Sequence, residues 1–314
     1  MESRSFFLDD SGHLRSGWRL GFYVVAFLVC VRLLQTVVFL AGPAISRRSA
    51  AELLSGAGGF VIGAAILFAS ATLVGWACGA IFEELPFRAI GWSFHSGWLR
   101  NFAVGTAIGA ASLLLAGIFA AVTRGLSFGI DPMAATSIEK TLTISAMVFV
   151  LAAAAEEVVF RGYPLQTLTR AKLAWLGVLL TAVPFAAVHL NNPNSARGFT
   201  FVNTVLAGIW LAIAYLRTGS LWFPLGIHWA WNWMQAAILG VPVSGINRLT
   251  PAPLLHAANQ GPDWLTGGAY GLEGGLACTV ALLVSMLVVW RTKLIVAADV
   301  TPRALHCHRR ISPS

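Results

Sequence analysis

The chain has 314 residues, of which 57% are hydrophobic and only 11% are charged, and its mean hydropathy is +0.74. Soluble domains carry about 25% charged residues, so this composition excludes an ordinary soluble protein and predicts a polytopic membrane protein. The formal net charge of +8 does not indicate nucleic-acid binding, because no basic soluble module accompanies it.

Eight apolar stretches follow one another along the chain. Their lengths lie near the roughly 20 residues with which an α-helix crosses the hydrocarbon core of a membrane. We therefore expect an all-α fold, a bundle of about eight transmembrane helices with short connections. The predicted spans are 18–42, 57–82, 102–122, 141–165, 173–190, 199–216, 220–240 and 270–290.

These spans form one predicted membrane domain, 18–290, with a segment 1–17 before it and a basic tail 291–314 after it. If the N-terminus is cytoplasmic, fourteen Arg and Lys residues lie on the cytoplasmic side and six on the other. This excess predicts a multi-pass protein of the plasma or inner membrane with both termini in the cytoplasm. The first span contains Arg32 and is too long for a signal peptide, so we interpret it as a retained helix.

Small and aromatic residues add two expectations about packing. The pairs Gly59–Gly63 and Gly105–Gly109 have the spacing of close contacts between membrane helices. Four tryptophans of the seventh span are typical of a membrane interface, where amphipathic rings gather. They are Trp222, Trp229, Trp231 and Trp233.

Two stretches share the pattern of adjacent glutamates followed by an arginine. IFEELPFR ends the second span and contains Glu83 and Glu84, while AEEVVFR lies in the fourth span and contains Glu156 and Glu157. Only the second stretch is followed by later helices that carry histidine and asparagine. We therefore interpret the first stretch as a charged turn at the membrane interface and the second as the candidate site.

Ionisable side chains are costly inside a membrane and mark functional sites. Apart from Arg32 and Glu273, the deep polar groups gather in the fourth, fifth and seventh spans. Three pairs are four residues apart, so each pair shares one helix face. These pairs are Glu157 with Arg161, Phe185 with His189, and His228 with Asn232.

Glu156 differs from its neighbour Glu157, because it is rotated by about 100° around the helix. We expect an ion pair with Arg161 to occupy Glu157, whereas Glu156 points elsewhere and is available for chemistry. A carboxylate and an imidazole held together can activate a water molecule as general base. A histidine with an asparagine, such as His228 with Asn232, can stabilise a developing oxyanion.

A zinc site is the alternative at the same residues. One glutamate and two histidines, here Glu156, His189 and His228, can ligate zinc in an open catalytic site. The residue types alone do not distinguish this from a metal-free site. The His306, Cys307 and His308 triplet in the tail has ligand-type residues, which we interpret as incidental in a basic tail. The zincin pattern HExxH is absent from the sequence.

EEVVFR (156–161), FAAVH (185–189) and HWAWN (228–232) resemble the three motifs EExxxR, FxxxH and HxxxN of the CPBP family. That family comprises CAAX proteases and bacteriocin-processing enzymes, also called Abi proteins or type II CAAX prenyl endopeptidases. The resemblance covers residues 140–235, and an eight-helix family fold agrees with the remaining predicted spans. It implies an intramembrane endopeptidase that cleaves membrane-associated protein or peptide substrates within the lipid bilayer.

The resemblance also implies roles for the motif residues. Glu156 with His189 activates water, and His228 with Asn232 forms the oxyanion site. Glu157, Arg161 and Phe185 support these groups. Both metal-dependent and glutamate mechanisms are proposed for the family; we expect the glutamate mechanism without a cofactor, with zinc as the alternative.

Two other function classes agree with the sequence. A non-catalytic immunity or scaffold protein can keep the three motifs as polar contacts that stabilise the fold, because fold does not fix function. A proton-coupled transporter also uses intramembrane carboxylates. The sequence shows no duplicated half with matching broken helices, which disfavours the transporter.

Overall fold

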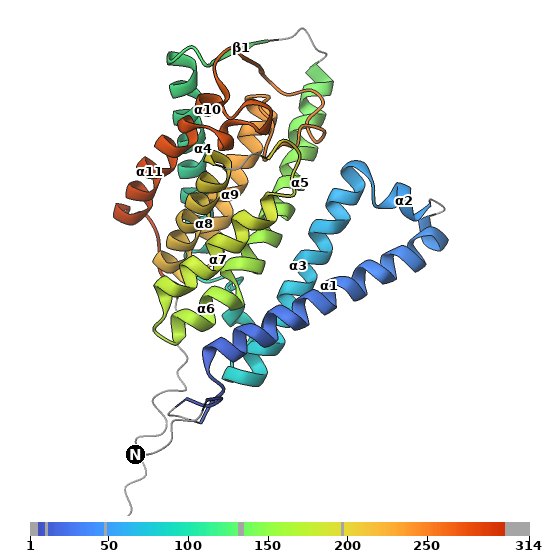
Figure 1. Ribbon diagram of the computed structural model, residues 1–314, viewed down its shortest axis with the longest axis vertical. Helices are drawn as coiled ribbons and strands as arrows, with labels where there is room; N and C mark the ends of the chain where they lie inside the picture. Colours follow the sequence, from blue (N-terminus) through green and yellow to red (C-terminus); the bar gives the residue numbers. More distant parts are fainter. Residues whose placement is uncertain (1–5, 10–11, 47–48, 131–134, 196–197, 299–314) are drawn as a thin grey trace, which may run out of the picture.

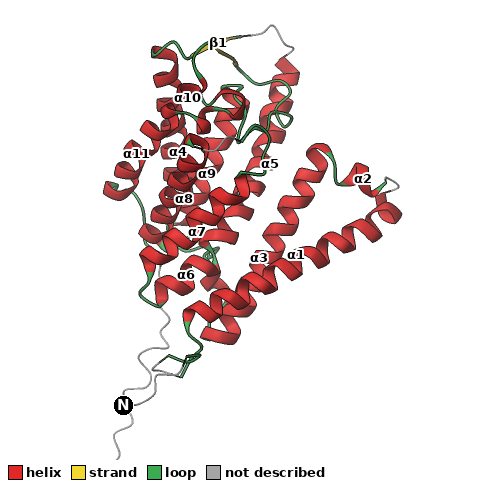
Figure 2. Ribbon diagram, in the orientation of Figure 1, coloured by secondary structure: helices red, strands yellow, loops and turns green. Residues whose placement is uncertain are grey.

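The computed structural model describes residues 6–9, 12–46, 49–130, 135–195 and 198–298, and this part of the chain is mainly helical (Figures 1 and 2). The main helices are α1 (Ser16–Ser46), α3 (Gly56–Glu83), α4 (Trp98–Val122), α5 (Ala135–Arg161), α6 (Tyr163–Arg170), α7 (Ala174–His189), α8 (Phe199–Thr218), α9 (Trp222–Trp233) and α11 (Leu276–Arg291). Short helices are α2 (Ala50–Leu53), α10 (Asp263–Thr266) and the turns η1 (Phe87–Ile90), η2 (Met234–Ile238), η3 (Gly268–Tyr270) and η4 (Leu272–Gly274). Strands β1 (Leu126–Gly129) and β2 (His256–Asn259) form one antiparallel pair.

The helices make this a multi-pass membrane protein. Within the described residues, five helical segments are long and apolar enough to cross a membrane: α1, α3, α4, α8 and α5 continued by α6. The apolar helices α7 and α11 are shorter, with 16 residues each, and α9 has 12. The all-α class is therefore confirmed, whereas eight full-length spans are not, because three of the predicted spans become shorter helices packed among the others.

The outer helices present apolar side chains outward, as a surface in contact with lipid requires. In α1, Phe22, Val25 and Leu33 are each more than half exposed. Figure 1 shows α1 and α3 as an arm that diverges from the remaining helices toward α2. In water an exposed apolar surface of this extent would be unfavourable, so it is consistent with a membrane environment.

Helices α4 and α9 pack closely because glycines face each other. A side chain on Gly105 would overlap the Phe223 carbonyl, and one on Gly109 would overlap the Ile227 carbonyl. The contact predicted from the Gly105–Gly109 pair is confirmed. The Gly59–Gly63 pair makes no such helix contact, because Gly63 faces open space.

The fourth predicted span is not one continuous helix. It ends at Arg161, and α6 begins at Tyr163 after a break at Gly162, whose ψ of −133° is not helical. A β-carbon at Gly162 would collide with the carbonyl of Val158, so the break requires glycine. The break ends α5 one turn after Glu157.

The upstream glutamate stretch ties three helices together at one end of the bundle. Glu83 accepts hydrogen bonds from Arg19 of α1 at 3.0 Å and from Arg170 of α6 at 2.9 Å, and its side chain is only 6% exposed. Glu84 and Arg88 are exposed. The exposure of Glu84 and Arg88 thus agrees with a charged turn, whereas Glu83 forms a partly buried ion-pair network with two arginines. The position of this turn at a membrane interface stays a prediction.

The long connection between α9 and α11 covers the opposite end of the bundle. It contains β2, which pairs with β1, and the Val243–Ile246 turn, closed by two backbone hydrogen bonds. The predicted seventh-span tryptophans donate their indole N–H groups to protein acceptors; their position at a membrane interface stays a prediction. Trp229 binds Ala146 O, and Trp233 binds Leu142 O. His306, Cys307 and His308 lie outside the described residues.

Candidate active site

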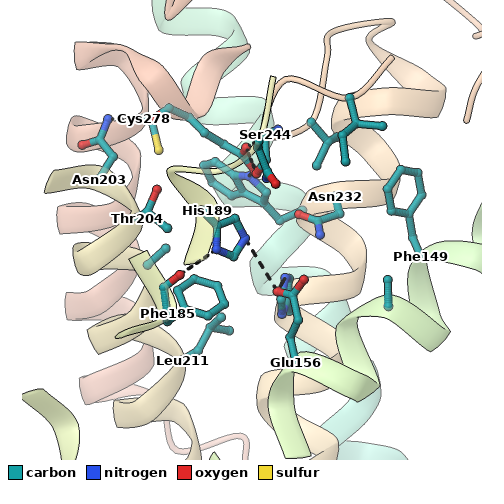
Figure 3. Close-up of a pocket in the computed structure, with 18 of the residues that line it drawn as sticks. Phe149, Glu156, Phe185, His189, Asn203, Thr204, Leu211, Asn232, Ser244 and Cys278 are labelled. Atoms are coloured by element: carbon teal, nitrogen blue, oxygen red, sulfur yellow. Dashed lines mark hydrogen bonds and ion pairs between the residues drawn. The ribbon is translucent and has the colours of Figure 1, made fainter. Parts of the chain in front are cut away.

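The three motifs meet at one cavity of about 210 Å³. Glu156 comes from α5, His189 from the end of α7, and His228 and Asn232 from α9. Figure 3 shows Glu156 and His189 directed toward one another, with Asn232 beside them. All four residues predicted to act line this cavity, although they come from three helices separated in sequence.

Glu156 is the group on which the two imidazoles converge. Its Oε2 lies 3.5 Å from His228 Nε2 and 3.9 Å from His189 Nε2. Within the described residues this oxygen accepts no hydrogen bond, although it is buried. The side chain as a whole is 30% exposed, and it lines the cavity. Glu156 is therefore placed to interact with a molecule that enters.

Hydrogen-bond acceptors hold both imidazoles at their Nδ1 atoms. His189 Nδ1 lies 2.7 Å from the Phe185 carbonyl, and His228 Nδ1 lies 2.8 Å from Glu157 Oε1. A carbonyl or a carboxylate can only accept, so each Nδ1 carries the proton and donates it. This assignment leaves both Nε2 atoms facing Glu156 and the cavity.

Glu157 and Arg161 form the expected ion pair, and both side chains are 0% exposed. Arg161 Nη1 donates to Glu157 Oε1 at 3.1 Å, and Nη2 donates to the Gly208 carbonyl of α8 at 3.1 Å. Since the same Glu157 oxygen accepts from His228, the pair connects α5, α8 and α9. The spacing argument that divided Glu156 from Glu157 is thus consistent with the observed geometry.

The Phe185 ring lies against both Arg161 and His189. Its ring centroid lies 4.7 Å from the Arg161 guanidinium carbon and 4.5 Å from the His189 ring centroid. The His228 ring packs against it edge to face at 6.2 Å. Phe185 is 3% exposed, so it fixes the imidazoles by packing and shields the ion pair from the cavity.

The cavity also contains polar residues that the three motifs do not include. Asn192, Asn203, Thr204, Ser244 and Glu273 line it together with the motif residues. Of these only Glu273 had a sequence signal, as an isolated acid in the predicted span 270–290. Asn192 and Ser244 lie in loops, and Asn203 and Thr204 are uncharged residues of α8. Burial raises the pKa of the Glu273 carboxyl, and the hydrogen bonds from Ser244 oppose this shift.

Zinc needs at least three converging protein ligands in a site of this kind. Glu156, His189 and His228 are suitable by residue type. However, nowhere in the described part of the chain are three or more His, Cys, Asp or Glu side chains grouped closely enough to hold a metal ion. The metal-free site therefore stays a prediction. Arg32 lies away from the cavity on the exposed side of α1.

Comparison with known proteins gives one match. No curated protein and no solved structure matches the chain. Residues 138–234 match the family model described as type II CAAX prenyl endopeptidase Rce1-like, which is a protease family. This segment contains the EExxxR, FxxxH and HxxxN motifs and every residue predicted to act. The resemblance to the CPBP and CAAX-protease family is therefore confirmed over the part of the chain that carries its motifs.

Proposed function

We propose that this protein is an intramembrane endopeptidase that hydrolyses peptide bonds of membrane-associated substrates. The observation that carries the proposal is the convergence of Glu156 on the two Nε2 atoms in a cavity that Asn232 also lines. A carboxylate between two oriented imidazoles is suited to proton transfer, which contributes about 10²–10⁴-fold to a rate. The match to a protease family supports the same reaction class.

In the proposed reaction, Glu156 takes a proton from a water molecule while the water oxygen attacks the scissile carbonyl carbon. His189 orients the water from the other side of the carboxylate. The carbonyl oxygen becomes an oxyanion, which accepts hydrogen bonds from Asn232 and from His228 Nε2–H. When the C–N bond breaks, Glu156 returns its proton to the leaving amine nitrogen.

His228 can donate from Nε2 only as an imidazolium, because Nδ1 already donates to Glu157. Two carboxylates face this ring, one at each nitrogen, so the charged form has a partner at both ends. The Arg161 guanidinium in turn balances the negative charge of Glu157. Glu157 and Arg161 therefore act through His228 and do not touch the substrate.

The steps above use side chains alone and need no cofactor. Metal content of the purified protein tests this choice, since the residue types are also those that zinc prefers. We expect less than one bound zinc per chain and no loss of cleavage with a chelator. About one zinc per chain that is lost in a His189→Ala variant would support a metal mechanism instead.

The proposed activity can be tested with purified protein in detergent. Transmembrane peptides and prenylated CAAX-type peptides are incubated with it, and the products are identified by mass spectrometry. We expect cleavage by the parent protein and its loss in Glu156→Ala and His228→Ala variants that are folded. Cleavage that is unaffected by both substitutions would show that another site is responsible, while a cellular phenotype that survives them would support a scaffold or immunity role.

A further inference from the structure

A second carboxylate faces the cavity, and it comes from outside the segment that matches the protease family. Glu273 on η4 lines the cavity with Glu156 and His189, although it lies beyond residues 138–234. Its Oε1 accepts a hydrogen bond from Trp231 Nε1 at 3.2 Å. Its Oε2 accepts from the Ser244 backbone N–H and hydroxyl, both at 2.6 Å. This carboxylate takes no part in the proposed reaction.

The charges around the cavity are unbalanced. Its described lining contains two carboxylates, Glu156 and Glu273, and no Arg or Lys side chain. The neighbouring cation, Arg161, is fully buried and paired with Glu157. The His228 imidazolium lies between Glu156 and Glu157, so among the described residues Glu273 is left without a cationic partner. A carboxylate without a cation in a largely apolar cavity favours a ligand of opposite charge. The cavity therefore favours a ligand with a positive group.

Two tryptophans line the cavity on this side, and one of them, Trp231, binds Glu273. Trp210 and Trp231 both line the cavity, and their rings pack edge to face with centroids 5.7 Å apart. Indole faces attract cations, and the attraction increases when the cation is removed from water. Oε1 of Glu273 accepts a single hydrogen bond in the described structure, so a second lone pair remains for a ligand N–H.

We propose that Glu273, Trp210 and Trp231 form a subsite that binds a positively charged side chain, lysine or arginine, of the peptide substrate. The inference rests on the proposed function only in naming the ligand as a substrate residue. The binding of an organic cation at this end of the cavity does not depend on peptide hydrolysis. Glu273 thereby becomes a determinant of specificity that the family motifs do not contain.

Binding is tested with two ligands that lack a peptide bond. Hexylammonium and the neutral 1-hexanol have the same chain length, and the titration follows tryptophan fluorescence of the full chain in one detergent. At about pH 8.5 an alkylamine is still protonated, and this pH favours the ionised form of a carboxyl group more than neutral pH does. We expect hexylammonium to bind at least tenfold more tightly than 1-hexanol. Equal affinity of the two ligands for the parent protein would overturn the proposal without any variant.

Three substitutions identify the responsible group. Glu273→Gln keeps an acceptor for Ser244 but removes the charge, so the preference for hexylammonium should disappear. Glu273→Asp keeps the charge and should retain at least part of the preference. Glu139→Gln removes a carboxylate from an exposed position on α5 and should change nothing. Thermal unfolding of each variant verifies the fold, and a folded Glu273→Gln variant that still prefers the ammonium would refute the assignment.

A cleavage measurement separates this inference from the proposed function. Transmembrane peptides carry lysine or the neutral norleucine at successive positions near the scissile bond. At one position we expect lysine to raise kcat/KM at least tenfold for the parent protein and not for Glu273→Gln. Cleavage without any preference refutes the subsite alone, whereas ammonium binding without cleavage refutes the peptidase alone.

Discussion

At the residue scale, two adjacent glutamates have different surroundings. The i,i+4 spacing predicted the Glu157–Arg161 pair, because one turn of helix brings those side chains together. The sequence could not predict that Glu157 also holds His228, since that contact joins residues 71 positions apart. Nor could it predict Glu273 in the cavity, because an irregular connection places it there.

The buried pair leads to a prediction about stability. Arg161→Met removes the guanidinium from a pair whose side chains are both fully buried and leaves Glu157 paired with His228, so we expect the free energy of unfolding to fall by about 3–5 kcal/mol. Arg170→Met is the matched control, because Glu83 keeps Arg19 and the Arg170 side chain is 31% exposed. The free energy of unfolding of Arg170→Met should fall by no more than about 1 kcal/mol. Denaturant titration in detergent measures both, and equal losses would contradict the role given to Arg161.

At the element scale, the site depends on how α5 ends and on how closely α9 approaches α4. The apolar stretches located the main helices to within a few residues. They did not reveal the separate helix α6, because the break at Gly162 arises from a backbone conformation that hydropathy does not report. The shortness of α9 was hidden because apolar residues continue beyond its end, whereas the predicted span 173–190 matches α7 to within one residue at each end.

The α4–α9 contact predicts opposite effects for two glycine substitutions. Gly109→Ala places a methyl group against the Ile227 carbonyl and should destabilise the fold by about 1–3 kcal/mol through overpacking. Gly63→Ala, at an open position inside α3, should leave stability unchanged or raise it by up to about 1 kcal/mol. Thermal unfolding in detergent compares them. A Gly109→Ala variant as stable as Gly63→Ala would show that the two helices can separate without cost.

At the scale of the whole molecule, the cavity lies toward one end of the bundle. The starts of α1 and α7 and the ends of α3 and α6 gather at the opposite end, around Glu83. Loop residues Asn192 and Ser244, by contrast, line the cavity. With the N-terminus in the cytoplasm, as the charge distribution predicts, substrates would reach the cavity from the non-cytoplasmic side.

Cysteine labelling tests this orientation. In a background with all four cysteines replaced by serine, we expect Asn191→Cys in intact cells to react with a membrane-impermeant maleimide. Phe94→Cys, which is 72% exposed in the loop after η1, should react only after the cells are opened. The reverse pattern would place the N-terminus outside and the cavity toward the cytoplasm.

The central claim is that Glu156 is the general base of a peptidase. The most direct measurement is kcat/KM for a cleaved transmembrane peptide with Glu156→Gln, which keeps the shape of the side chain and removes its basicity. We predict that kcat/KM of Glu156→Gln falls by at least about 100-fold while its unfolding temperature stays unchanged. The control variant Glu139→Gln should keep the activity of the parent. A folded Glu156→Gln protein that cleaves within a few-fold of the parent would contradict the claim.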